Sequence, residues 1–263
     1  MAIQSRAGVH TTFFLNQVAR QVRQDYLENL TGLAWLVLQP VMMLAVYAFV
    51  FSTIFKARLP DAVGVDFVPY LAVAFWPWNA FAEAVLKASN SITGHAALIG
   101  KVALASEQLP LATVTATFLM HLAGYAAVLL ILQVAGTDIQ WLMLLPALAV
   151  LLLLWLLACA LGLLASASQV FIRDLAQALP PLMTFWFFTT PILYSPSFLP
   201  ESLQGIMQWN PMTWFVMTLR ELLLFGRFGD PLGWGIVVAA TVLLAWLSLR
   251  YFRRFSGHFQ DFL

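Results

Sequence analysis

Residues 141–166 read WLMLLPALAVLLLLWLLACALGLLAS, an apolar run without a charged side chain. A helix needs about 20 apolar residues to cross the hydrocarbon core of a bilayer, so this run is long enough to span it. The whole chain has the same bias, since 62% of its 263 residues are hydrophobic and only 10% are charged. A soluble domain carries about 25% charged residues, which leaves lipid as the solvent. The sequence therefore predicts an all-α integral membrane protein.

Six runs of this kind predict six transmembrane helices within a single transmembrane domain, residues 1–263. The predicted spans are residues 33–55, 68–86, 109–134, 141–166, 175–194 and 232–249. Another helix, residues 13–30, is expected to lie in the membrane interface. Its apolar residues recur every four positions and its arginines occupy other faces, a pattern typical of an amphipathic interface helix.

The placement of Lys and Arg predicts the orientation of these spans. With six spans and both termini in the cytoplasm, most basic residues lie inside, as the positive-inside rule requires. A seventh span at residues 204–226 would move Arg250, Arg253 and Arg254 outside. We therefore expect residues 195–230 to form two short re-entrant helices at the outer side, which meet at Asn210–Pro211. An amphipathic helix lying on the outer leaflet is the alternative.

Ionisable side chains are few within the predicted spans. Glu83 and Lys87 lie one helical turn apart, in the order that favours an ion pair. His121 stands alone in the third span, and we interpret it as a hydrogen-bonded packing residue. Residues 94–102, GHAALIGKV, differ from a phosphate-binding loop in the spacing of the glycines and in lacking the final hydroxyl. No catalytic residue, metal site or cofactor of the chain's own is predicted.

Without a motor of its own, a transporter would need energy from a partner. Such a partner is expected to dock on two inward segments, residues 89–108 and 171–174. The net charge of +1 gives no sign of nucleic-acid binding.

Aromatic side chains gather toward the outer halves of the predicted spans and in residues 195–230. Trp and Tyr form belts at membrane interfaces, whereas aromatic planes can also stack on sugar rings, and the residues leave both interpretations open. The candidate substrate-contacting set is Trp35, Trp76, Trp78, Trp186, Phe187, Phe188, Tyr194, Trp209, Trp214 and Phe215.

Several short motifs follow one another along nearly the whole chain. They are Gly32-x-x-Trp35, Pro40, Phe75-Trp76-Pro77-Trp78, Leu98-Ile99-Gly100-Lys101-Val102, Phe171-Ile172-Arg173-Asp174, Thr190-Pro191-Ile192-Leu193-Tyr194, Asn210-Pro211 and Arg220. This ordered set resembles the membrane subunit of ABC-2-type polysaccharide exporters, which move O-antigen, capsule or teichoic-acid chains.

The resemblance implies a homodimer in the bacterial inner membrane that binds two copies of a separate ATPase. It would thread a lipid-linked polysaccharide through a channel lined by the first and fifth spans and their aromatic residues. The implied ATPase-coupling residues are Leu98, Ile99, Gly100, Lys101, Arg173 and Asp174, of which the last two would fix their turn to neighbouring helices. The implied outward gate, residues 197–207 and 211–225, would include Pro191, Asn210, Pro211 and Arg220. A partner in the periplasm or outer membrane would be compatible with this role.

Two other functions remain open at this stage. An ABC-2 permease for a drug or lipid has a similar layout of spans, although the large number of aromatic residues favours a polymer as the substrate. A membrane-embedded enzyme acting on lipid-linked sugars is the third possibility. Arg220 is also open, because it could hold the gate shut or contact a lipid pyrophosphate, or pair with Glu201 or Glu221 at the outer interface.

Overall fold

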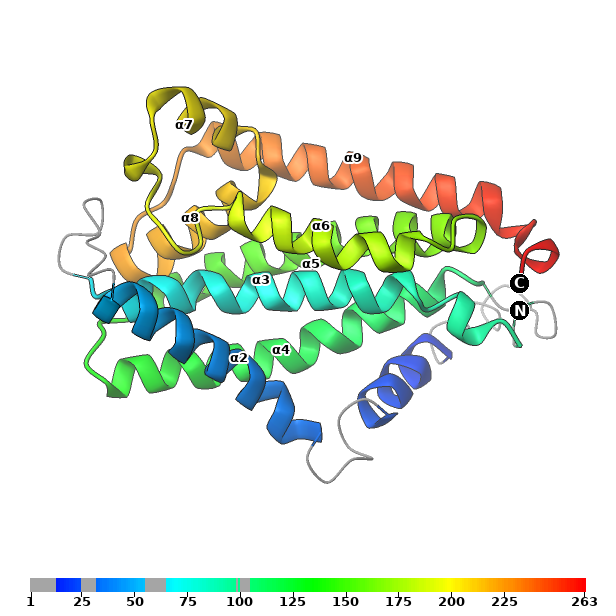
Figure 1. The fold of residues 1–263 in the computed structure, drawn as a ribbon, viewed down its shortest axis with the longest axis horizontal. Coiled ribbons are helices and arrows are strands. Elements are labelled where there is room, and N and C mark those ends of the chain that lie inside the picture. The colour runs from blue at the N-terminus through cyan, green and yellow to red at the C-terminus, as the bar shows by residue number, and fades with distance from the viewer. Residues whose placement is uncertain (1–12, 25–31, 55–64, 98, 100–104) are drawn as a thin grey trace, which may run out of the picture.

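The fold is a bundle of helices that run along the long axis of the molecule (Figure 1). The structure is a computed structural model, and it describes residues 13–24, 32–54, 65–97, 99 and 105–263. Every regular element in this part of the chain is helical, which confirms the all-α prediction. A helix over residues 13–22, continued by a π-helical turn at residues 23–24, precedes the bundle, and residues 25–30 of the predicted interface helix lie outside the described residues.

The bundle consists of eight labelled α-helices and short single-turn helices. The α-helices are α2 (Gly32–Ala48), α3 (Phe67–Ser89), α4 (Gln108–Val134), α5 (Leu144–Phe171), α6 (Leu175–Phe188), α7 (Glu201–Gln208), α8 (Pro211–Phe225) and α9 (Pro231–Ser256). A π-helical turn, Phe49–Ile54, extends α2, and 3-10 turns at Trp141–Met143 and Phe259–Asp261 precede α5 and follow α9.

Three helices in the described part of the chain are long and apolar enough to cross a membrane. They cover Gln108–Val134, Trp141–Phe171 and Pro231–Ser256, and they correspond to the third, fourth and sixth predicted spans. The second predicted span is the 23-residue helix α3, which is largely buried within the protein. The stretches Pro40–Ile54 and Leu175–Phe188 are apolar but shorter.

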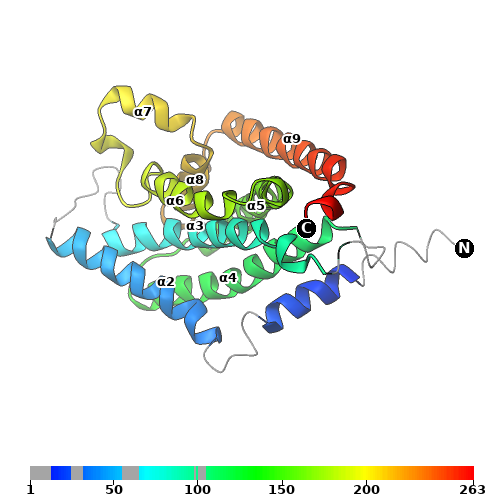
Figure 2. The same ribbon diagram turned by 45° about the vertical axis from the view of Figure 1, so that its right-hand side comes forward.

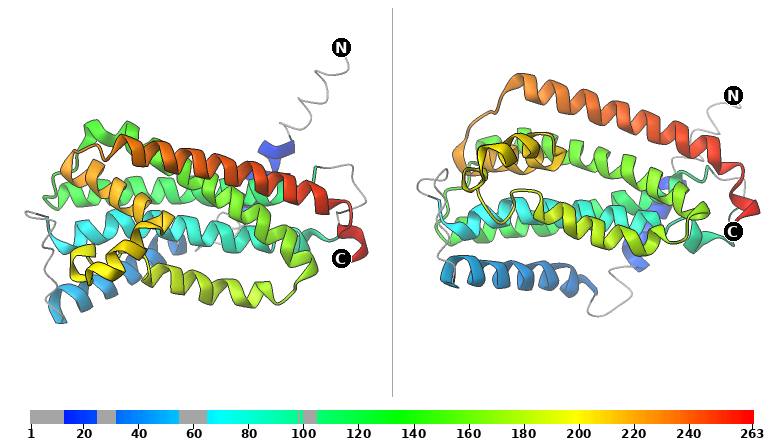
Figure 3. Two further views of the ribbon diagram at one scale, coloured as in Figure 1. Left: turned by 90° about the horizontal axis from the view of Figure 1, so that it is seen from above. Right: turned by 45° about the horizontal axis from the view of Figure 1, so that its top comes forward.

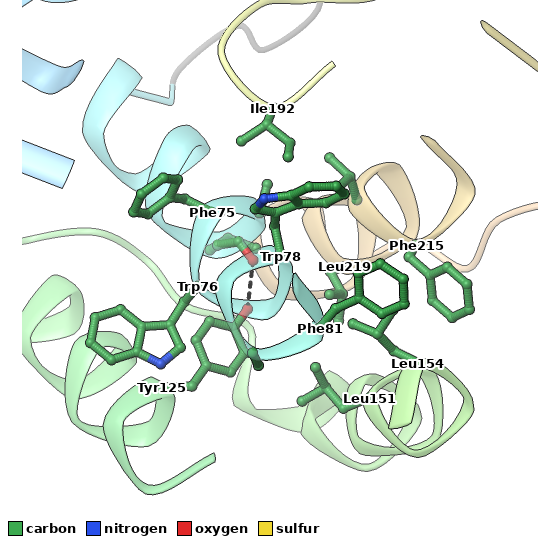
Figure 4. Close-up of a cluster of buried hydrophobic side chains, with 14 of the residues drawn as sticks. Phe75, Trp76, Trp78, Phe81, Tyr125, Leu151, Leu154, Ile192, Phe215 and Leu219 are labelled. Atoms are coloured by element: carbon green, nitrogen blue, oxygen red, sulfur yellow. Dashed lines mark hydrogen bonds between the residues drawn. The ribbon is translucent and has the colours of Figure 1, made fainter. Parts of the chain in front are cut away.

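Helix α3 forms the centre of the core. Its aromatic residues meet α4 on one side and α5 and α8 on another (Figure 4), and Leu71 and Phe81 have no exposed surface. The buried Tyr125 hydroxyl on α4 donates a 2.9 Å hydrogen bond to the Val73 carbonyl of α3. Small residues allow the close approach, because a Cβ on Gly162 of α5 would lie 2.9 Å from the Cβ of Ala88.

The two ends of the bundle differ in charge. At one end lie the C-terminal turn of α9, the α5–α6 turn and the helix 13–22 (Figures 1 and 3). We call it the basic end and define it by Arg20, Arg173, Arg253 and Arg254. The opposite end carries α7 and the connection from α8 to α9, and we call it the α7–α8 end.

The predicted fifth span differs from the observed helix. Residues 175–194 were expected to form one span, but α6 ends at Phe188 and Thr189–Tyr194 form turns. Pro191 lacks the backbone N–H that a continuing helix would need. The chain then turns outward to α7 before it returns through α8 (Figure 2).

The two short helices predicted between the last two spans are present, but they differ in burial. Helix α7 has no buried residue, and its apolar Ile206 is 67% exposed. Helix α8 packs into the core against α3 and α5, with Leu219 and Leu222 fully buried. Re-entry of these two helices into the membrane stays a prediction, and the apolar exposed surface of α7 also matches the alternative of an amphipathic interface helix.

Candidate functional site

Asn210 joins the start of α8 to the end of α6. Its side-chain oxygen caps α8 by accepting from Met212 N at 3.0 Å, and it also accepts from Trp186 Nε1 at 2.8 Å. Its amide nitrogen donates to the Thr189 carbonyl at 3.2 Å and to the Thr190 hydroxyl at 3.0 Å. An Asn at the N-cap followed by Pro at the first helical position is a common start for a helix. Here the cap also fixes a second segment.

Arg220 holds the same segment from farther along α8. It is 1% exposed, and its guanidinium donates to the carbonyls of Pro191 and Ile192, each at 2.7 Å. Its Nε donates to the Tyr70 carbonyl at 2.9 Å. The guanidinium carbon lies 3.5 Å from the centre of the Tyr70 ring, a cation–π contact. Carbonyl dipoles and an aromatic face thus solvate this buried charge.

We call this arrangement the α8 clamp and define it by Asn210, Arg220 and the segment 189–192. Of the predicted gate residues, Pro191, Asn210 and Arg220 lie in it, and Pro211 follows Asn210 as the first residue of α8. The alternative of an interface arginine paired with Glu201 or Glu221 is wrong, because within the described residues the guanidinium's partners are carbonyls, the Tyr70 ring and the Met217 sulfur.

A charged cluster lies between α3 and α4, nearer the basic end. Glu83 accepts from Lys87 Nζ at 2.8 Å, as the spacing predicted, and its other oxygen lies 2.8 Å from His121 Nε2. His121 is 1% exposed, and its carbonyl accepts from Trp76 Nε1 at 3.0 Å. His121 is therefore a hydrogen-bonded buried residue, and its partner is a carboxylate that sequence spacing did not predict.

The aromatic set separates into buried and exposed members. Trp76, Trp78, Phe187 and Phe215 are at most 6% exposed, because they fill the space between α3, α4, α6 and α8. The rings of these four pack on other side chains of this protomer, and their contact with a substrate stays a prediction. Trp78, for example, lies edge-on to Trp186 with ring centres 6.0 Å apart.

Other members of the aromatic set reach the surface. Phe188 is 53% and Trp209 is 89% exposed, whereas Trp186, Tyr194 and Trp214 are partly buried. The side chain of Trp35 lies outside the described residues. Phe185, which sequence reasoning missed, is 69% exposed on the same face of α6 as Phe188. The i, i+3 spacing of these two rings on a helix could have identified that face.

The basic end contains three of the predicted ATPase-coupling residues, namely Ile99, Arg173 and Asp174. Ile99 packs partly buried against a cluster that includes Ile92 and Phe259, and Leu98, Gly100 and Lys101 lie outside the described residues. Arg173 and Asp174 are exposed.

Those two side chains were expected to fix the α5–α6 turn to neighbouring helices. No side-chain hydrogen bond or ion pair of either one occurs within the described ranges, so that role stays a prediction. The turn is held instead by backbone bonds such as Gln177 N to the Asp174 carbonyl at 3.0 Å, and by Phe171, whose ring lies 4.9 Å from that of Phe262. The charges of the turn and the 59% exposed Ile172 point away from the bundle.

The sequence is similar to those of known transport proteins along most of its length. A sequence profile described as ABC-2 type transporter matches residues 14–224. The chain is 22% identical over 246 residues to the O-antigen export system permease protein RfbA of Klebsiella pneumoniae, covering 93% of this chain and 92% of the relative. It is 25% identical over 250 residues to RfbA of Myxococcus xanthus, with 94% of each chain covered. The polysialic acid transport protein KpsM of Escherichia coli is 20% identical over 234 residues, covering 89% and 90%.

Proposed function

The chain belongs to the ABC-2 type transporter family, and from this premise we propose that it is the channel-forming membrane subunit of a polysaccharide exporter. In this proposal, two copies carry a lipid-linked polysaccharide across the bacterial inner membrane. Two copies of a separate ATPase, which bind ATP and magnesium, supply the energy. The similarity to permeases named for O-antigen export and polysialic acid transport, along about nine-tenths of each chain, carries the proposal.

The proposed topology has six spans, namely α2 with its π-helical turn, α3, α4, α5, α6 and α9. The basic end would face the cytoplasm, because basic residues concentrate on cytoplasmic loops of membrane proteins. Both termini would then be cytoplasmic. Helix α7 would lie in the outer interface, and α8 would re-enter the membrane from that side.

Within this topology the α8 clamp would act as part of the outward gate. The segment 189–192 links α6 to α7, and both Asn210 and Arg220 bind its carbonyl groups. Movement of α6 would therefore pull on α8 and on Tyr70 of α3 through short hydrogen bonds. The exposed rings of Phe185 and Phe188 would offer a stacking surface for sugars on the channel side of α6.

Affinity purification of the tagged chain from its native membrane in mild detergent tests the proposal. We expect a nucleotide-binding subunit to copurify in a one-to-one ratio, and deletion of the chain to abolish a surface polysaccharide while its lipid-linked precursor accumulates. A stable preparation without an ATPase would instead favour a membrane-embedded enzyme, and intact surface polysaccharide would favour a permease for a drug or lipid.

The α5–α6 turn provides a sharper test of ATPase docking. We expect Arg173→Glu to weaken ATPase binding about fivefold, because an exposed ion pair is worth up to about 1 kcal/mol. Binding of the purified ATPase to the permease in nanodiscs measures the effect, which should shrink at high salt. The control is Arg227→Glu, an exposed charge at the α7–α8 end. Equal binding by both variants would exclude the turn from the docking surface.

A further inference from the structure

One face of α3 carries polar side chains within an otherwise apolar helix. Asn79, Glu83 and Lys87 follow one another at intervals of four residues, so they form a row along the helix. All three are partly exposed, and the side chains of Glu83 and Lys87 have 37% and 31% of their surface accessible. The row begins near the middle of α3 and ends at Lys87, in the last turn of that helix.

Helix α4 lies beside this row, because its His121 contacts Glu83. Contacts from α2 reach α3 nearer the α7–α8 end, where Tyr47 lies edge-on to Phe75 and Phe51 stacks on Phe67. The first turns of α2 diverge from α3 toward the basic end (Figures 1 and 2). All three side chains of the row keep part of their surface accessible in this protomer.

A partly exposed row of polar and charged groups within a predicted span restricts what can lie against it. Ionisable residues within membrane spans face the protein interior or a water-filled cavity, because hydrocarbon solvates them poorly. Here the carboxylate is also fixed in place, since Lys87 binds one oxygen and the buried His121 the other. Trp76 anchors the His121 carbonyl in turn. This rigid support is typical of binding sites.

We propose that Asn79, Glu83 and Lys87 form a polar track that hydrogen-bonds to glycan hydroxyl groups entering the passage from the basic end. His121 is a positioning residue that orients Glu83. The inference rests on the proposed function and adds to it a contact surface on α3, separate from the aromatic residues of α6. Sugar hydroxyls match the track because each one both donates and accepts, whereas acyl chains can do neither.

Cysteine accessibility tests whether the polar track is exposed to water. In a Cys159→Ala background, inverted membrane vesicles carrying Asn79→Cys are treated with a charged methanethiosulfonate. The control is Val242→Cys, which lies near the middle of α9 and is 52% exposed on its outer face. We expect modification at position 79 to be about a hundredfold faster, the factor implied by the cost of a charge in hydrocarbon. Equally slow modification at both positions would overturn the track.

Photo-crosslinking identifies what occupies the track. A photoreactive amino acid at position 79 or 242 is activated in cells that export the polymer, and the denatured permease is treated with periodate and biotin hydrazide to label sugar diols. We expect glycan on the position-79 protein alone. If cells with the wild-type chain export no polymer, both the proposed function and the polar track are wrong. Normal export without glycan at position 79, or crosslinking to a second copy instead, overturns only the track.

The role of His121 has a separate readout. His121→Gln keeps an amide donor that can reach Glu83, whereas His121→Leu removes it. We expect glycan crosslinking at position 79 to survive in the first variant and to be lost in the second, at matched protein levels and thermal stability. Equal crosslinking in both variants would show that His121 only packs.

Discussion

Arg220→Ala is expected to abolish most export and to destabilise the protein by about 3 kcal/mol or more. The substitution leaves the carbonyls of Pro191 and Ile192 without their 2.7 Å donors in a buried site, and it empties the space against the Tyr70 ring. Leaving buried polar groups without their charged partner lowers the stability of the folded state by several kcal/mol. Loss of the guanidinium would also free the segment 189–192 from α8, so we expect the α6 end to shift and the outward gate to leak.

Three measurements separate these effects. Thermal unfolding in detergent reports stability, surface polysaccharide at matched protein levels reports export, and leakage of a charged dye from proteoliposomes reports the gate. Arg220→Lys should be intermediate, because an ammonium lacks the planar fork that reaches several carbonyls at once. Arg227→Ala, an exposed arginine beyond the same helix, should behave as wild type. Unchanged export and leakage in Arg220→Ala would remove the α8 clamp from the mechanism.

The second large effect is a loss of folding stability, which we expect when a single methyl group is added at either of two glycines. A Cβ on Gly124 would lie 2.5 Å from Cζ2 of Trp76, and one on Gly162 would lie 2.9 Å from Cβ of Ala88 and 3.2 Å from Cγ2 of Val114. Trp76 cannot easily move, because it is 1% exposed and its Nε1 donates to the His121 carbonyl. We expect Gly124→Ala and Gly162→Ala each to cost about 1–3 kcal/mol by overpacking.

Gly235→Ala is the matched control for these two variants. Apart from its chain neighbours and the nearby backbone of α9, no atom lies within 4 Å of a Cβ at that position, so the same methyl group should be neutral or slightly stabilising through helix propensity. Thermal unfolding in one detergent compares all three variants. Stability equal to wild type in Gly124→Ala and Gly162→Ala would mean that α3 does not pack on α4 and α5 as closely as described.

Local patterns in the sequence were sufficient for several parts of the site. The Asn210–Pro211 pair predicts the start of α8, and the structure places the cap and the helix there. The spacing of Glu83 and Lys87 predicts their ion pair, which is present at 2.8 Å. Both predictions succeed because the interacting groups lie within one helical turn, where spacing alone fixes geometry.

The aromatic residues show where this reasoning fails. Trp76, Trp78 and Phe188 belong to similar apolar stretches, yet the first two are buried in the core and the third is 53% exposed. Hydropathy marks a residue as apolar but does not tell lipid, substrate and protein apart, because all three accept an aromatic ring. Only the packing of α4 and α6 against α3 decides which rings are enclosed.

The sequence by itself determined an all-helical membrane protein, the approximate limits of its long helices and the ordered motifs of its family, since these depend on apolar length and local spacing. Tertiary structure decided the surroundings of the charged residues. Arg220 contacts Tyr70, which is 150 residues away in the sequence, and His121 contacts Glu83, which is 38 residues away. The physical reason is that a buried charge takes its partners from whichever helices pack around it, and that packing is a property of the assembled bundle rather than of any one segment.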